Sequence, residues 1–379
     1  MPRTTKSGRV SLSHLKKAAF RWLGRFWRRS LWYKFLLIFA STIILLTGVF
    51  YGIGEWYTQR HKNQPLVLGA SFIADYAQAL GVNPQQTLSA MLNDLNMKHV
   101  RLVSYWNRIE KTPGVYDFSA LDGQFALANQ YGAKVSLAIG LRQPRWPECH
   151  APDWVMGTTK SFWQPALYKF IGAVVDHYKN NSALSDYELE NEFFMKVFGE
   201  CTDFDRQRLV EELALVKQHD TTHKVIISRS DNWVGIPVGR PVPDEFAISV
   251  YKRVWDAAIT HRYFEYPLPP WFYAGLAGSE EIWSGKDMII HELQAEPWPA
   301  TGQFITDATL TEQFKSMDAK RMKSRIAYGE STGMRTIDLW GAEWWYWLKE
   351  KHRDPSVWNV VKDAVAKAEA RNQKLASQT

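Results

Sequence analysis

The sequence contains only two cysteines, no internal repeat and no glycine-rich loop that could cradle a phosphate. Two cysteines among 379 residues exclude a disulfide-dense scaffold and a four-cysteine zinc site. The Gly-x-Gly pattern at Gly52 and Gly54 lies in an apolar run, which excludes a nucleotide-binding loop there. The pair His291-Glu292 lacks the second histidine of a zinc protease, because position 295 is alanine. We therefore expect neither a metal nor a cofactor.

Acidic residues are absent from the first 34 positions, which hold ten Lys or Arg. Taking these ten from the 46 basic residues of the chain leaves 36 against 39 acidic ones, a net charge of −3. The main part of the chain is therefore nearly neutral, and we expect no nucleic acid partner. The basic charge belongs to a tail, residues 1–34. Apolar positions among the basic ones in 11–34 fit an amphipathic helix on a membrane surface as well as a disordered tail.

An apolar run without a charge occupies residues 35–54. A helix of that length spans about 30 Å, the thickness of the hydrocarbon core of a bilayer. Aromatic residues flank the run as an interfacial belt: Trp32, Tyr33, Trp56 and Tyr57. Because basic segments stay inside, we expect a single-pass anchor in membrane lipid, with the N-terminus cytoplasmic and residues 55–379 outside the cell membrane. The rival interpretation is a cleaved signal peptide, whose apolar region is usually about 7–15 residues long.

Beyond a polar stalk at 55–64, short apolar segments alternate with helical patterns. The expected strands are 66–71, 99–104, 134–139, 186–191, 224–228, 246–250, 288–291 and 336–340. The expected helices are 84–94, 119–131, 161–178, 203–219, 309–328 and 355–376. This α/β alternation predicts a (β/α)8 TIM barrel over residues 65–379, preceded by the single transmembrane helix. The stretch from 251 to 287 shows no helical period, and we expect a long insertion there.

In such a barrel all strand C-termini open onto one face, so residues distant in sequence meet there. Two carboxylates 100 positions apart fall at strand ends, Glu192 on the fourth strand and Glu292 on the seventh. Glu190 is two residues before Glu192 and would face the same side, and Glu296 competes with Glu292 for its role. The other rim residues are Ser71, Arg101, Tyr105, Trp106, Arg142, Asn191, Tyr251 and Trp340. Paired carboxylates can protonate a leaving oxygen and attack an anomeric carbon, and Trp, with 18 copies, suits sugar stacking.

These residues resemble clan A glycoside hydrolases, retaining (β/α)8 enzymes that include the family 5 cellulases, over residues 65–350. The signature of that group is an Asn-Glu pair ending the fourth strand, matched by Asn191-Glu192, and a Glu ending the seventh, matched by Glu292. The resemblance implies that Glu192 is the acid/base, that Asn191 binds the sugar 2-hydroxyl, and that Glu292 is the nucleophile. Three further positions match residues that support the nucleophile or form the sugar platform: Arg101, Tyr251 and Trp340.

Two classes of function remain open at this point. The first is a retaining glycosidase that cleaves β-glycosidic bonds of an oligo- or polysaccharide by double displacement, which requires carboxyl groups about 5–5.5 Å apart. The second is a catalytically inactive barrel that binds glycans or partner proteins at the cell surface. The sugar, the linkage and the oligomeric state do not follow from the sequence.

The two cysteines, Cys149 and Cys201, both follow expected strands on the same face of the barrel, in neighbouring loops. In an oxidising compartment this placement predicts a disulfide. The alternative is a pair of buried thiols.

Overall fold

The computed structural model describes residues 31–229, 239–300 and 303–378. The chain divides into two compact units, Met1–Gly52 and Ile53–Thr379. Of the predicted basic tail, residues 1–30 lie outside the described residues, and residues 31–34 already belong to helix α2, Leu31–His61. By length and composition α2 is a candidate transmembrane helix, although a signal sequence near an N-terminus passes the same test.

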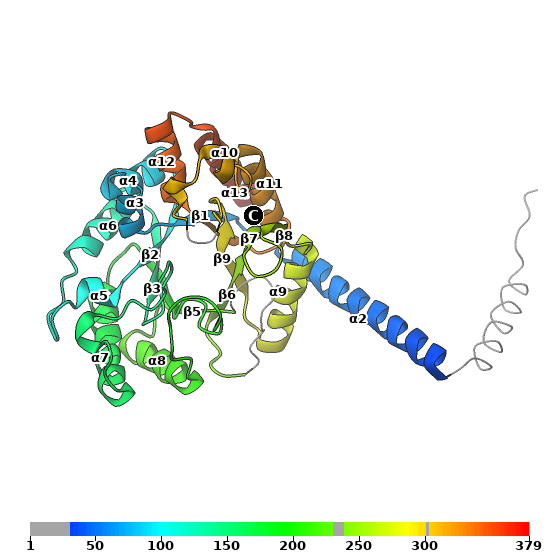
Figure 1. The fold of residues 1–379 in the computed structure, drawn as a ribbon, viewed down its shortest axis with the longest axis horizontal. Helices are drawn as coiled ribbons and strands as arrows, with labels where there is room; N and C mark the ends of the chain where they lie inside the picture. The colour runs from blue at the N-terminus through cyan, green and yellow to red at the C-terminus, as the bar shows by residue number, and fades with distance from the viewer. Residues whose placement is uncertain (1–30, 230–238, 301–302, 379) are drawn as a thin grey trace, which may run out of the picture. The chain divides into compact units, whose positions relative to one another are not determined.

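Parallel strands close into an eight-stranded barrel in the order β1-β10-β9-β6-β5-β4-β3-β2 (Figure 1). Their bounds are β1 Val67–Ser71, β2 His99–Val103, β3 Lys134–Ile139, β4 Leu184–Leu189, β5 Lys224–Ser228, β6 Glu245–Val250, β9 Met288–Gln294 and β10 Thr336–Trp340. The predicted (β/α)8 barrel is therefore confirmed. All seven residues of β9 are buried, as expected for a strand covered by side chains on both faces.

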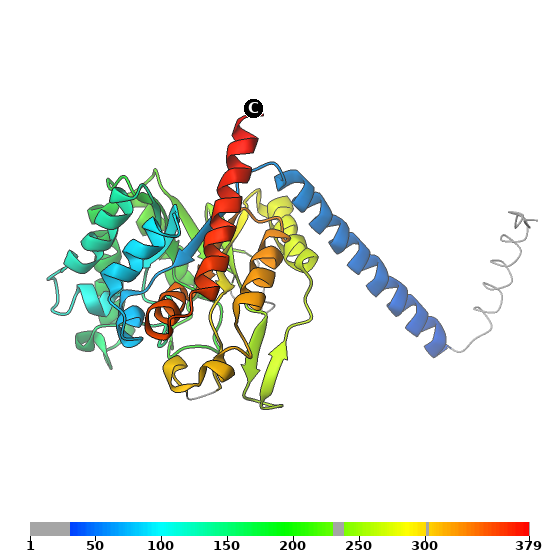
Figure 2. The ribbon, with the colours of Figure 1, turned by 90° about the horizontal axis from the view of Figure 1, so that it is seen from above.

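Helices surround the strands in both views of the barrel (Figures 1 and 2). Their bounds are α3 Ala74–Ala79, α4 Pro84–Asn93, α5 Trp106–Ile109, α6 Ser119–Gln130, α7 Lys160–Tyr178, α8 Arg206–His219, α9 Pro270–Ser284, α10 Leu310–Gln313, α11 Ala319–Glu330, α12 Ala342–His352 and α13 Ser356–Ala376. The helix predicted at 309–328 is divided in two. Its second part starts where the Asp318 side chain accepts a hydrogen bond from the backbone N–H of Arg321, a new N-cap.

The stretch after Tyr251 differs from the expected insertion without a helix. It opens with an antiparallel hairpin, β7 Arg253–Asp256 and β8 Arg262–Glu265, which projects from one end of the barrel (Figure 2). It then forms α9, a regular barrel helix, so the prediction was wrong for this part. Residues 273–278 of α9 are buried without interruption, and a helix that is buried all round shows no helical period in its sequence.

The end of α2 covers the outer side of α9. Residues 55–61, predicted to form a polar stalk, are helical and belong to the barrel unit. Tyr57 is fully buried, and its hydroxyl donates to Asp287 Oδ1 at 2.6 Å. A Cβ at Gly54 would lie 2.8 Å from the backbone oxygen of Trp271, so the two helices approach at backbone distance. The last part of α2, from residue 53 to residue 61, therefore packs as part of the barrel unit.

Replacement of Tyr57 by Ala should lower the free energy of unfolding by about 3–5 kcal/mol, because it opens a cavity between α2 and α9. The measurement is denaturant or thermal unfolding of the full chain in detergent micelles. The matched control is Trp56→Ala, since Trp56 is 41% exposed one position earlier. Equal stability losses in the two variants would contradict the buried contact of Tyr57.

Candidate active site

Glu292 is held by a cation and a phenol inside the barrel mouth. Its Oε1 accepts from Arg101 Nη1 at 2.9 Å, and its Oε2 accepts from the Tyr251 hydroxyl at 2.6 Å. β9 continues two residues beyond Glu292, so this carboxylate lies within the strand and not at its end. Burial, and then the charges of Glu292 and Glu192, raise the pKa of Tyr251 well above its ordinary value. Tyr251 therefore remains a hydrogen-bond donor to Glu292 at any physiological pH.

Glu192 reaches the same place from the loop after β4, which ends at Leu189. Its backbone has a left-handed φ of 45°. Its Oε1 accepts from Ser249 Oγ at 2.5 Å. Ser249 of β6 is the register partner of Glu292 in β9. Both Glu192 and Glu292 raise the pKa of Tyr251, so the two glutamates singled out in the sequence lie near the same hydroxyl.

Arg101 connects the nucleophile candidate to two other side chains. Its Nη2 donates to Glu188 Oε1 at 2.7 Å and to Asn191 Oδ1 at 2.9 Å, and its Nε donates to the other oxygen of Glu188. Although burial lowers the pKa of Arg101, Glu188 and Glu292 together hold it above the ordinary value. Burial raises the pKa of Glu188, but Arg101 and His291 outweigh that effect and lower it to about 2. Arg101 is therefore a fixed cation between two carboxylates.

Glu188 and Ser249 are site residues that the sequence prediction missed. His291 joins them, with Nδ1 2.7 Å from Glu188 Oε1 and Nε2 3.0 Å from Ser249 Oγ. A continuous polar chain therefore runs from Glu192 to Glu292 through the barrel interior. The sequence signal for Glu188 is the alternation along β4, which turns every second residue inward.

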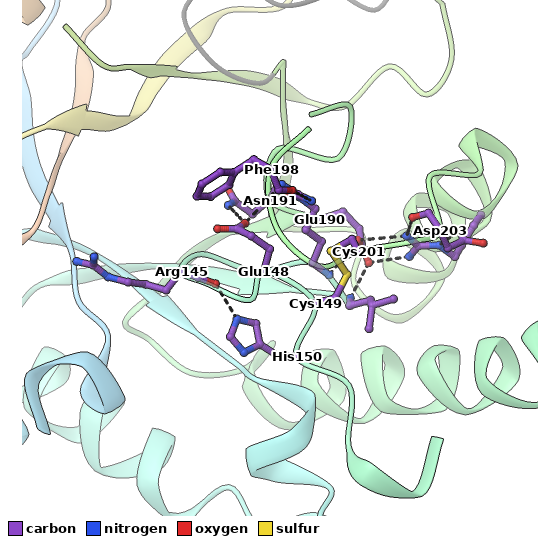
Figure 3. Close-up of a disulfide and its surroundings, with 12 residues drawn as sticks. Arg145, Glu148, Cys149, His150, Glu190, Asn191, Phe198, Cys201 and Asp203 are labelled. Atoms are coloured by element: carbon purple, nitrogen blue, oxygen red, sulfur yellow. Dashed lines mark hydrogen bonds and ion pairs between the residues drawn. A yellow bond between two sulfur atoms is a disulfide. The ribbon is translucent and has the colours of Figure 1, made fainter. Parts of the chain in front are cut away.

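Glu190 does not face the same side as Glu192, contrary to the expectation. Strand alternation ends at Leu189, and Glu190 has a left-handed φ of 56°. Its carboxylate accepts from the backbone N–H of Leu141 at 2.6 Å and from Arg208 Nη1 at 2.8 Å. Glu190 therefore anchors the loop after β3 to helix α8 (Figure 3).

The ring of Trp340 lies under the guanidinium of Arg145. The Arg145 carbon Cζ is 4.4 Å from the centroid of Trp340 and 3.4 Å from that of Tyr76. Arg145 also makes a bidentate ion pair with Glu296, at 2.6 and 2.9 Å. Both carboxylate oxygens of Glu296 therefore accept hydrogen bonds from Arg145. Trp340 is 7% exposed, so the face that the resemblance assigns to a sugar is covered by a cation in this structure.

The cysteines form the expected disulfide, Cys149–Cys201, beside the site (Figure 3). The residue before Cys149 is Glu148, whose Oε2 accepts from Asn191 Nδ2 at 3.0 Å. Burial is the largest influence on its pKa; Arg142 lowers it, the charge of Glu292 raises it, and the result is about 7. Glu148 is thus a further carboxyl at the site, beside Glu192, Glu292 and Glu188. It was missed because its position depends on the path of a loop.

Glu148 should make stability depend on pH. Its folded-state pKa of about 7 exceeds its ordinary value of 4.5, so folding favours the protonated form. The contribution of Glu148 to the free energy of unfolding is fully present below pH 4.5 and is lost as pH rises through about 7. The loss amounts to about 3 kcal/mol. Glu148→Gln should flatten this decline in unfolding free energy between pH 5 and 8.

The control for this titration is Glu350→Gln on the exposed end of α12, which should follow the wild type. Burial also raises the pKa of Glu343 to about 7, so this group titrates in the same range. Its contribution to the pH dependence of stability is the same in the wild type and in Glu148→Gln. Parallel stability curves for wild type and Glu148→Gln would contradict the assignment.

Other rim residues have structural contacts. Arg142 donates from Nε to the backbone oxygen of Asn191 at 2.7 Å and so fixes the loop that carries the Asn-Glu pair. Ser71 Oγ accepts from Arg101 at 3.3 Å. Trp106 belongs to α5, is fully buried and donates to Glu110 at 2.6 Å, so it contributes to the core. Within the described ranges, no group of three His, Cys, Asp or Glu is arranged to hold a metal.

Comparison with known proteins gave matches to solved structures alone: no family model and no curated protein matches the chain. GH5_18 from Bifidobacterium longum aligns with a TM-score of 0.52 at 11% identity, over 73% of this chain and 70% of that one. Xylanase 10B from Thermotoga maritima aligns at 0.51 and 13% identity, over 81% and 98%. The exo-β-1,4-mannosidase Op5Man5 from Opitutaceae bacterium strain TAV5 aligns at 0.51 and 13%, over 82% and 60%. At these identities the similarity establishes the fold alone, a (β/α)8 barrel.

Proposed function

We propose that this protein is a retaining glycoside hydrolase that cleaves β-glycosidic bonds, with Glu292 as nucleophile and Glu192 as acid/base. The observation that carries the proposal is the chain of hydrogen bonds that joins Glu192 to Glu292 through the barrel interior, with Glu292 oriented by Arg101 and Tyr251. A binding surface has no need of two such carboxylates, one of them held by a buried arginine. A double-displacement enzyme needs both.

The proposed reaction has two steps. Glu292 attacks the anomeric carbon while Glu192 gives a proton to the departing oxygen, and a glycosyl-enzyme forms. Glu192, now a carboxylate, takes a proton from a water that attacks the same carbon and releases Glu292. Arg101 and Tyr251 orient the carboxylate of Glu292 through a charge-assisted pair and a hydroxyl donor.

We infer that the enzyme is held in the cell membrane by α2, with its tail in the cytoplasm and its barrel outside. The supporting features are the uncharged run within α2, the ten basic residues before it and the Cys149–Cys201 disulfide, which suits an oxidising compartment. The mass of the protein isolated from membranes tests this: an intact N-terminus supports the anchor, and removal of residues 1–50 assigns a signal peptide.

The function is tested with the full chain in detergent micelles. The panel contains aryl β-glycosides together with xylan and β-mannosides, because the similar structures include a xylanase and an exo-β-1,4-mannosidase. The proposal is supported if the wild type hydrolyses a member of the panel and Glu192→Gln or Glu292→Gln abolishes that hydrolysis. The control variant Glu350→Gln should preserve it.

A catalytically inactive barrel that binds glycans or partners is the second candidate. The observation that favours it is Arg145, whose guanidinium covers the ring of Trp340. Binding of a glycan from the panel, measured by calorimetry, without turnover of any substrate would assign this second function.

A further inference from the structure

A basic cavity lies away from the paired glutamates, between the β7–β8 hairpin and helix α11. Its volume is about 80 Å³. Four basic residues and one acidic residue line it: Lys252, Arg253, Arg321, Arg325 and Glu265. A single water needs roughly 10–15 Å³, so the cavity has room for a small polyatomic group.

Arg325 is the buried cation of this cavity. Its side chain is 6% exposed, and its Nε is enclosed without a hydrogen-bond partner. Within the described ranges its guanidinium makes neither a hydrogen bond nor an ion pair shorter than 4 Å. Burial lowers its pKa to about 10, against the weaker opposing effect of Glu265. Burying a charge in this way is costly unless an anion accompanies it.

The neighbouring cations are positioned by neutral groups. Lys252 Nζ donates to the backbone oxygens of Tyr266 and of Leu268, the latter at 3.0 Å. Arg253 Nε donates to the backbone oxygen of Lys315 at 2.7 Å. Carbonyl groups satisfy these N–H donors but leave the positive charges in place.

The acidic groups around the cavity compensate only part of this charge. Glu265 is 3.4 Å from Arg253 Nη1, and Asp318 is 2.5 Å from Arg321 Nη1. Lys252 and Arg325 have no carboxylate within 4 Å in the described residues. Two positive charges therefore face the cavity without a counter-ion.

We propose that this cavity binds an oxyanion, a phosphate or sulfate group, on Arg325 and Lys252. A guanidinium offers five N–H donors in a planar fork that matches such oxygens, and the lysine adds a compact charge. This site goes beyond the proposed glycosidase activity and does not depend on it. The anion is either free in solution or an ester on a sugar, and both present the same oxygens.

The cavity adjoins the proposed active site through the backbone. Lys252 directly follows Tyr251, and the backbone N–H groups of Lys252 and Arg253 both donate to Gln294 Oε1 at 2.9 Å. Gln294 is two residues beyond Glu292 on β9. An anion here would be bound by the residue next to Tyr251 and near the end of β9, two residues beyond Glu292.

The experiment measures anion binding to the full chain in detergent micelles by calorimetry and thermal unfolding. Inorganic phosphate and sulfate are compared with chloride at matched ionic strength, and we expect a higher Tm with the oxyanions. Arg325→Gln should weaken phosphate binding at least tenfold. Glu265→Gln should tighten it severalfold by removing the competing carboxylate. Arg108→Gln, on a side chain that is 62% exposed and remote from the cavity, is the control.

Two outcomes overturn the proposal: phosphate that raises the Tm no more than chloride does, or Arg325→Gln binding phosphate as the wild type does. If Arg325→Gln fails to fold, unchanged affinity in Glu265→Gln overturns it instead. Glucose 6-phosphate and glucose 6-sulfate identify the source. Tenfold tighter binding of an ester assigns the group to a sugar, and equal binding assigns the free anion. None of these measurements requires hydrolysis, so their failure is distinct from failure of the proposed enzyme.

Discussion

Replacement of Glu292 by Gln is expected to reduce hydrolysis of an aryl β-glycoside by a factor on the order of 10⁴ or more, the loss typical of a missing nucleophile. An amide cannot form the glycosyl-enzyme bond. The fold should tolerate the change, because the amide oxygen still accepts from Arg101 or Tyr251. Arg101 also keeps Glu188 as its counter-ion, at 2.7 Å, so no buried charge is left alone. An unchanged Tm with lost activity is therefore the expected pattern.

The decisive measurement is covalent labelling with a 2-deoxy-2-fluoro glycoside, followed by peptide mass analysis. The label should reside on Glu292 in the wild type and disappear in Glu292→Gln. Glu188 and Glu148 are the nearby carboxyls that provide the internal comparison. A label on either of them would reject the assignment of the nucleophile.

Replacement of Glu192 by Gln is expected to give a loss that depends on the leaving group. Natural glycans, whose leaving oxygen needs a proton, should react about 10²–10⁴-fold more slowly. A dinitrophenyl glycoside leaves without that proton, so its glycosyl-enzyme should still form and accumulate as an initial burst. The reason is that only the acid and base roles are removed, while Glu292 keeps both of its donors.

Azide separates the two roles in the same assay. In Glu192→Gln it should attack the glycosyl-enzyme without a general base and restore turnover, with the β-glycosyl azide as product. In Glu292→Gln it should instead replace the missing nucleophile and give the α-azide. The reverse pattern would exchange the two assignments. Absence of any burst in Glu192→Gln would remove the residue from the acid/base role.

Most strands could be predicted from the sequence because buried parallel strands are short apolar runs, a local property. β3, β5 and β10 have the expected bounds, and β9 extends three residues further than expected. The helix α9 could not be predicted in the same way. Its residues 273–278 are all buried, partly because the end of α2 packs against α9 at Gly54, so this part of the sequence shows no alternation between buried and exposed faces.

Part of the candidate site could be predicted because the order of the strands follows from local patterns in the sequence. Strand order alone brings Glu192, Asn191 and Glu292 to one end of the barrel. Glu148 and Ser249 were missed, since the first depends on a loop tied by a disulfide and the second on the register between β6 and β9. Neither the path of this loop nor the register between the two strands produces a periodic pattern in the sequence.

The sequence by itself determined the barrel, the basic tail before an apolar helix and the placement of one glutamate just after the fourth barrel strand and one on the seventh. These follow from periodicity and charge along the chain, which act over a few residues. The tertiary structure alone decided the contacts between distant residues. In the folded chain Glu190 pairs with Arg208, and Arg145 lies over the ring of Trp340. Lys252 and Arg325 line the same cavity. Side-chain pairing over such separations depends on packing in three dimensions, and no local pattern encodes it.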